Sequence, residues 1–257
     1  MSLRIEHLDR VLILTLDRPA VRNAFDAELI VELTRAYALA ARDPAVRAVV
    51  LMAIGPAFSA GGDLNWMRRA ASAPEAENWA DARGLAALMH VVDTCPKPTL
   101  ARIQGSAFAG ALGLIACSDI AVAVPEAEFA VTEARFGLIP AVIAPYLVRA
   151  VGARAARFLS LTGERIPASE ARRLGLVHEV VAAEALDRTV ARHVATLLAG
   201  GPQALAAIKR LVPFVDRPID DAMIEETTRR LMRIRSSAEA REGLAAFFDK
   251  RKPGWAP

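Results

Sequence analysis

The stretch QGSAFAGALGLIACSD, residues 104–119, decides the fold. No charged side chain lies between Arg102 and Asp119, most of the residues are small, and the only reactive groups are two serines and a cysteine. A strand-like segment, PTLARIQG at 98–105, leads into the stretch, and another, DIAVAV at 119–124, follows it. Glycines between a strand and a helix permit positive φ and leave main-chain N–H groups uncovered. We therefore expect a glycine-rich turn here that opens a helix.

The segments around this stretch alternate between strand and helix patterns. Strands are predicted at 10–19 (RVLILTLDRP) and 46–54 (VRAVVLMAI), and helices at 25–44 and 74–92. The first helix has Asp26 as its expected N-cap, and its predicted buried stripe is Leu29, Leu33, Ala36, Tyr37 and Ala40. Such alternation is typical of the α/β class. After GLVHEVV at 175–181 only helical patterns remain, so we predict an α/β core over 1–182 and a helical region over 183–257.

Composition limits the class of protein. The 257 residues are 54% hydrophobic with a net charge of +3, and acidic and basic residues are interspersed. These values predict a globular protein without a nucleic-acid face, although the pI is basic. The two cysteines fit no metal-ligand spacing and are expected to be buried and inert. The charged N-terminal segment and the lack of a long apolar run predict a cytoplasmic protein without a membrane span.

Two glycine-rich turns of the same kind carry the chemistry. The first is FSAGGDLNWM at 58–67 and the second is GSAFAGALGL at 105–114; each follows a strand and precedes a helix. Together their N–H groups could form an oxyanion hole. The alternative is two tight helix entries that need small residues for packing. A Ser106–His178 nucleophilic pair is a further, weaker alternative.

Six motifs in order extend over essentially the whole chain. They are RPAVRNAFD (18–26), AFSAGGDL (57–64), KPTLARIQGSAFAGALGLIACSDIAVA (97–123), AEFAVTEARFGLIP (127–140), RAVGARAARFLSLTGERIPASEARRLGLVHEVV (149–181) and EGLAAFFDKRKPGW (242–255). In this order the chain resembles the enoyl-CoA hydratase/isomerase, or crotonase, superfamily. The resemblance implies a spiral of ββα units and a C-terminal helical region that joins subunits into trimers, often paired as hexamers.

The resemblance also implies which residues act. Gly62 and Gly110 would donate N–H groups to the thioester oxygen, where charge develops in an enolate. Glu133 matches the second glutamate of the family's hydratases, whereas Gly113 stands where the first would be. The residues implied to contact substrate or coenzyme A are Arg22, Ala24, Ala60, Gly62, Asp63, Leu64, Gly110, Phe247 and Lys250. Of these, Asp63 is expected to accept main-chain hydrogen bonds at its turn rather than to catalyse, and Phe247 and Lys250 would reach the coenzyme of a neighbouring subunit.

A single carboxylate leaves the reaction open. Hydration of a 2-enoyl-CoA thioester with Glu133 acting in turn as base and acid is one possibility, and double-bond isomerisation is the other. The motifs look most similar to bacterial methylglutaconyl-CoA hydratase-like proteins of leucine degradation. Glycine at 113 would then make room for a second substrate carboxylate, with Arg135 as its partner. A non-catalytic acyl-CoA or RNA binder is the alternative of another class.

Neither a metal nor a cofactor is expected beyond the coenzyme A of the substrate. Apolar walls from Phe129, Phe136, Leu138 and Ile139 should raise the pKa of Glu133. Apolar residues of the C-terminal helices should be partly buried between subunits; they are Ile208, Leu211, Val212, Met232 and Phe248.

Overall fold

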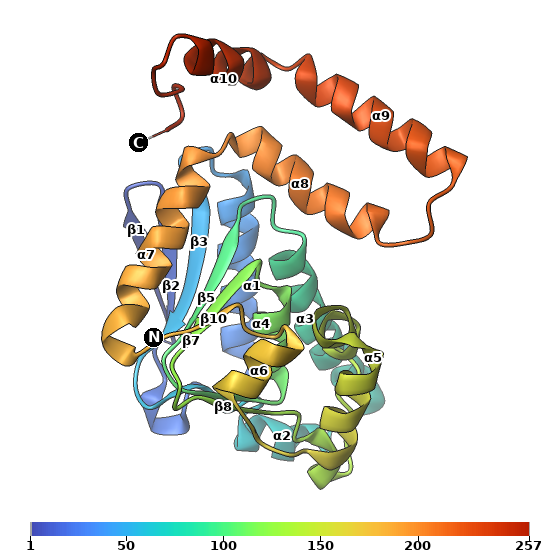
Figure 1. The fold of residues 1–257 in the computed structure, drawn as a ribbon. Helices are drawn as coiled ribbons and strands as arrows, with labels where there is room; N and C mark the ends of the chain where they lie inside the picture. Colours follow the sequence, from blue (N-terminus) through green and yellow to red (C-terminus); the bar gives the residue numbers. More distant parts are fainter. Residues whose placement is uncertain (1, 257) are drawn as a thin grey trace.

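The computed structural model describes residues 2–256, which fold as repeated strand–strand–helix units (Figure 1). The units are β1 (Leu3–Leu8), β2 (Val11–Leu16) and α1 (Ala27–Arg42); β3 (Ala48–Ala53), β4 (Ala57–Ser59), α2 (Leu64–Ala70) and α3 (Glu75–Asp93); β5 (Thr99–Ile103), β6 (Ser106–Phe108) and α4 (Gly110–Cys117); and β7 (Ile120–Ala123), β8 (Glu128–Ala130) and α5 (Ala144–Thr162). Next come β9 (Ile166–Pro167), α6 (Ala168–Leu174), β10 (Glu179–Val180) and the helices α7 (Ala183–Ala199), α8 (Pro202–Val215), α9 (Asp221–Arg235) and α10 (Ala238–Phe248). The predicted α/β class is confirmed.

The strands form two sheets. The six-stranded sheet has the order β1-β2-β3-β5-β7-β10, and the four-stranded sheet has the order β4-β6-β8-β9. In the second, third and fourth units the first strand therefore enters the large sheet and the second strand enters the small one. Parallel pairing of β3 with β5 and of β5 with β7 stacks successive units in register. The chain advances one strand in both sheets with each turn of the spiral.

Helix α1 forms where its apolar stripe and its cap predict. Asp26 accepts a hydrogen bond from the main-chain N–H of Leu29 at 2.9 Å, which confirms the expected N-cap. All five residues of the predicted stripe are buried. The solvent side of the same helix carries Val31, which is 65% exposed. The hydrophobic period of 3.6 residues thus sets which face packs on the core.

The C-terminal helices divide into one that covers the core and three that extend from it. Helix α7 begins at the predicted boundary but packs on β3, β5 and β7, opposite α1 and α3 (Figure 1). The part that leaves the core starts at α8, and α9 and α10 lie beyond it (Figure 1). The end of the chain returns, because the Trp255 indole N–H donates to the Ala199 carbonyl and Arg47 donates to the Trp255 carbonyl.

The projecting helices expose large apolar side chains. Ile208, Val212, Met232 and Phe248 are 52%, 59%, 55% and 75% exposed, and Leu211 is half-buried. Their expected burial between subunits stays a prediction. Among residues 2–256 no helix is both long and apolar enough to cross a membrane.

Leu33→Ala should lower the free energy of unfolding by about 2–5 kcal/mol, because Leu33 is fully buried in α1 and the truncation leaves a cavity. Val31→Ala, on the exposed side of the same helix, should change it by less than about 0.5 kcal/mol. Urea denaturation of both variants measures the difference. Equal effects would contradict the assignment of the two faces.

Candidate active site

Three parallel strands of the small sheet end at one edge, and a candidate functional residue follows each. Strand β6 pairs in parallel with β4 and with β8. Gly62 follows β4, Gly110 follows β6, and Glu133 follows β8. The carboxyl ends of parallel strands form the usual ligand-binding edge of an α/β sheet. The sheet order therefore brings together residues that are 71 positions apart at the extremes, Gly62 and Glu133.

The two glycine-rich turns touch directly. Gly61 has a φ of +87°, and a Cβ added there would lie 2.8 Å from the Phe108 carbonyl oxygen and 2.9 Å from the Ala109 Cβ. Only glycine fits both the left-handed conformation and this approach. The first turn therefore rests against the main chain of the second.

Phe25 fixes the direction of the Gly62 N–H. Its main-chain N–H donates to Gly61 O at 2.7 Å, and its carbonyl accepts from the Asp63 N–H at 2.7 Å. This isolated parallel bridge holds the residues on both sides of Gly62, so the Gly62 N–H itself points away from Phe25. It has no hydrogen-bond partner within residues 2–256.

Backbone strain places the second N–H. Ala109 has φ 50° and ψ −123°, a conformation that L residues rarely adopt and that costs about 1–3 kcal/mol. It precedes Gly110, the first residue of α4, whose N–H has no partner within the helix. The Ala109 N–H donates to Ala130 O at 2.9 Å, which ties the turn to the end of β8.

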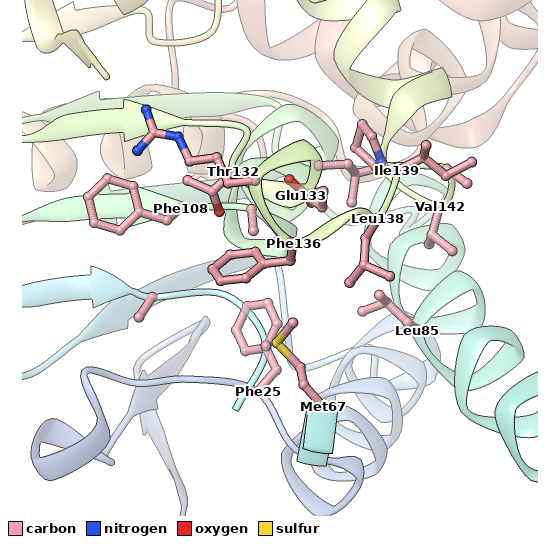
Figure 2. Close-up of a pocket in the computed structure, with 18 of the residues that line it drawn as sticks. Phe25, Met67, Leu85, Phe108, Thr132, Glu133, Phe136, Leu138, Ile139 and Val142 are labelled. Atoms are coloured by element: carbon pink, nitrogen blue, oxygen red, sulfur yellow. The ribbon is translucent and has the colours of Figure 1, made fainter. Parts of the chain in front are cut away.

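A pocket of about 530 Å³ opens at this point. Figure 2 shows Phe25 and Met67 on one side and Thr132, Glu133, Phe136 and Leu138 on the other, with Leu85, Ile139 and Val142 at one end. The full lining is Phe25, Ala60, Gly62, Leu64, Trp66, Met67, Ala82, Leu85, Phe108, Ala109, Gly110, Thr132, Glu133, Arg135, Phe136, Leu138, Ile139, Pro140, Ala141, Val142, Ile143 and Arg165. Gly62, Gly110 and Glu133 thus share one largely apolar pocket, as the oxyanion hypothesis requires.

Glu133 is the one carboxylate that lines this pocket in the described chain. It begins the short 3-10 helix Glu133–Phe136, and its Oε2 atom is buried without a hydrogen-bond partner. Burial raises the pKa of Glu133, and the nearby N–H groups of Glu133 and Thr132 offset this only in part. The predicted direction of the pKa shift is confirmed. A carboxylate with one unpaired oxygen and a raised pKa can accept and return a proton.

The walls around Glu133 differ in part from the prediction. Phe136, Leu138 and Ile139 line the pocket as expected, although each is at least half exposed in the single chain. Phe129 does not line it. Its side chain is fully buried in the core because β8 pairs with β6 and β9 on either side.

The expected room at Gly113 does not exist. A Cβ at Gly113 would lie 2.5 Å from Cγ2 of Ile143 and 2.8 Å from Sδ of Met89. These two side chains fill the space that a glutamate would need, and Gly113 itself does not line the pocket. The hypothesis that this glycine makes room for a second substrate carboxylate is therefore wrong.

Of the other predicted site residues, Ala60 and Leu64 line the pocket. Asp63 has the expected structural contacts: it caps α2 by accepting from the N–H groups of Asn65 at 2.9 Å and Trp66 at 3.1 Å. Arg135 also lines the pocket, and its guanidinium has no ion pair within residues 2–256.

The four residues predicted at the nucleotide end of coenzyme A lie outside the pocket. Arg22 is exposed with a φ of 52°, whereas Ala24 is buried, and its carbonyl accepts from Arg18 at 2.7 Å. Phe247 is 76% exposed and Lys250 is exposed, both at the end of the projecting helices. Their contacts with coenzyme A stay predictions.

Some residues that support or line the pocket were not predicted from the sequence. Asn23 is fully buried, and its amide donates to Ile54 O and Ala57 O at 2.9 Å each, which fixes the loop before β4. Trp66, Met67 and Leu85 form part of the pocket wall from α2 and α3. An apolar side chain on a helix carries no sequence signal that separates a pocket wall from ordinary core.

The described residues do not form the sites that nucleophilic, thiol or metal chemistry would need. Ser106 Oγ accepts from the Glu128 N–H and His178 Nδ1 accepts from the Ala121 N–H, so the two side chains form no nucleophilic pair. Both cysteines are buried and unpaired, as expected, and burial raises the pKa of each. Within the described residues, no group of three or more His, Cys, Asp or Glu side chains could hold a metal ion.

Comparison with known proteins agrees with this geometry. The sequence profile of the enoyl-CoA hydratase/isomerase family matches residues 6–257. An enoyl-CoA hydratase of Shewanella pealeana has a solved structure with a TM-score of 0.96 and 43% identity, over 99% of this chain and 96% of that one. An enoyl-CoA hydratase of Mycobacterium tuberculosis is 31% identical over 98% of this chain and 95% of its own length. A 1,2-epoxyphenylacetyl-CoA isomerase of Escherichia coli is 30% identical over 98% of each. The chain belongs to the enoyl-CoA hydratase/isomerase family.

Proposed function

We propose that the chain adds water to a 2-enoyl-CoA thioester, or removes it, through an enolate whose oxygen is held by the N–H groups of Gly62 and Gly110. The observation that carries this proposal is that both N–H groups lack hydrogen-bond partners among residues 2–256 and lie at one apolar pocket that also holds Glu133. Donors fixed before the reaction stabilise developing charge without reorganisation. Removal of one such donor typically costs about 3 kcal/mol of barrier.

Glu133 supplies the acid–base chemistry in this proposal. It accepts a proton from water as oxygen attacks Cβ, and it then delivers a proton to Cα of the enolate. The raised pKa suits both steps, because it makes the carboxylate a stronger base toward water than an ordinary glutamate, and the protonated group can still give its proton to the enolate carbon. One carboxylate acting in turn replaces the two of the family's usual hydratases.

Isomerisation is the second candidate, and a specific observation favours it. Gly113, Ile143 and Met89 leave no place for a second carboxylate, so water has one general base rather than two groups to orient it. A single carboxylate can move a proton between Cα and Cγ of the thioester. The names of the relatives include both hydratases and an isomerase.

We also propose a substrate class, contacts for coenzyme A and an oligomeric state. The acyl group is branched and carries a second carboxylate, as in methylglutaconyl-CoA, and Arg135 is its partner, since this guanidinium has no competing ion pair. Coenzyme A contacts Arg22 and the main chain near Ala24, and Phe247 and Lys250 of a neighbouring subunit close over its base. The exposed apolar side chains of α8 to α10 support a homotrimer, alone or paired as a hexamer.

A panel of thioesters tests the reaction and the substrate class. Crotonyl-CoA should lose its enoyl absorbance and gain the mass of one water, and 3-methylglutaconyl-CoA should react faster than 3-methylcrotonyl-CoA, which lacks the second carboxylate. Arg135→Leu should remove that preference. If 3-butenoyl-CoA is converted to crotonyl-CoA and water is never added, the chain is an isomerase; binding without turnover would make it a non-catalytic acyl-CoA protein.

Glu133→Gln should lower kcat by about 10²-fold or more, because the amide keeps the shape but cannot accept a proton. Acyl-CoA binding should persist, measured by titration calorimetry with butyryl-CoA. Glu170→Gln, which changes a half-buried carboxylate on α6 that does not line the pocket, is the matched control and should retain full activity. Undiminished turnover by Glu133→Gln would move the chemistry to another residue.

The pH dependence follows from the raised pKa. Glu133 must be ionised to act on water, so kcat/KM should rise with pH through a pKa above the ordinary glutamate range. The carboxyl binds its proton more tightly in the folded chain, so its contribution to stability falls as pH rises from the ordinary to the raised pKa. Above that range Glu133→Gln should be at least as stable as the wild type. A lower unfolding free energy for the variant at pH 8 would contradict the assigned burial penalty.

A further inference from the structure

Arg18 lies behind the first glycine-rich turn and contacts both helix caps beside it. Its Nη2 is 2.7 Å from Oδ2 of Asp26 and 3.6 Å from Oδ2 of Asp63. Its Nη1 donates to the Ala24 carbonyl at 2.7 Å, and its main-chain N–H donates to the side chain of Asn23 at 2.8 Å. The mechanism proposed above gives this cation no part.

Asp63 presents an electrostatic problem at the site. It follows Gly62 directly, is buried, and accepts from two N–H groups of α2 through Oδ1 alone. Its Oδ1 atom serves as the helix cap, but the negative charge of the carboxylate sits one residue from the N–H that would hold a developing oxyanion. Like charges repel more strongly where apolar walls reduce screening. Uncompensated, Asp63 would raise the barrier that the oxyanion donors lower.

We propose that Arg18 is a positioning residue that bridges Asp26 and Asp63 and offsets the charge of Asp63, so that the Gly62 N–H meets the thioester oxygen without an uncompensated negative charge beside it. This inference rests on the proposed function. Three of the contacts of Arg18 are with the N-cap residues of α1 and α2 and with the loop that precedes α1. The planar guanidinium can serve these partners at once, whereas a lysine ammonium is a single point charge.

Charge neutralisation predicts that two mutations compensate each other. Arg18→Met should lower kcat by about tenfold and leave KM within about twofold, because Arg18 touches no part of the pocket. Asp63→Asn keeps the oxygen that caps α2 and removes the charge. The double variant Arg18→Met/Asp63→Asn should therefore recover most of the lost kcat. Arg173→Met, which removes an exposed partner of Glu170 on α6, is the control and should match the wild type.

A merely structural role for Arg18 gives the opposite result. In that case the double variant would be no more active than Arg18→Met, because Asp63→Asn restores none of the contacts that Arg18 makes with Asp26 and Ala24. A rise in KM at constant kcat would also overturn the proposal. If Arg18→Met does not fold, Asp63→Asn in the presence of Arg18 still tests the charge, through the carbonyl measurement described next.

A measurement without turnover separates this inference from the proposed reaction. The infrared stretch of a ¹³C-labelled thioester carbonyl in bound butyryl-CoA reports how strongly the two N–H groups polarise it. It should move toward the unbound frequency in Arg18→Met and return in the double variant, and Asp63→Asn alone should not move it in that direction. An unchanged stretch in all variants overturns the role of Arg18. A shifted stretch in a protein that converts no enoyl-CoA overturns the proposed reaction and leaves the role of Arg18 standing.

Discussion

The rest of the site depends on the contact of Gly61 with Phe108 and Ala109. At this point two turns from different units of the spiral meet main chain to main chain, with no room for one additional carbon atom. The parallel pairing of β4 with β6 brings the turns together. Phe25 contacts both turns: its main chain forms hydrogen bonds with Gly61 and Asp63, and its ring packs against Gly110. A pocket with two uncovered N–H groups requires this closeness, since either turn alone is an ordinary helix entry.

Several departures from local rules lie at or beside the pocket. Ala109 has a backbone conformation that favours glycine, Glu133 has a buried oxygen without a partner, and Asp63 is a buried carboxylate. Each costs stability, and each is held in place by tightly packed surroundings such as the parallel sheets and the buried stripe of α1. The large sheet and its helices therefore act as the rigid support for strain concentrated at the edge of the small sheet.

Features that depend on residues within one helix or turn could be predicted from the sequence. The period of α1 and its Asp26 cap predicted the helix and its buried face. The glycine spacing with the family resemblance predicted that Gly62, Gly110 and Glu133 lie together, and they line one pocket; their roles stay predictions. Sequence reasoning missed what depends on neighbours distant in sequence. The three residues of β6 lie inside the stretch predicted as a turn, because so short a strand is formed by pairing with β4 and β8 rather than by its own pattern. The position of Phe129 and the side chains facing Gly113 likewise follow from packing alone.

The packing at Gly113 also bears on how the single-carboxylate site arose. The missing glutamate is not a one-residue change, because Ile143, which precedes α5, and Met89 of α3 occupy the space beside Gly113. A glutamate at 113 would need both to move or to become smaller, and Ile143 also lines the pocket. The apolar end of the pocket and the absence of a second carboxylate beside Glu133 are thus one feature of the core. A glutamate at 113 would therefore reshape the wall of the pocket beside Ile143.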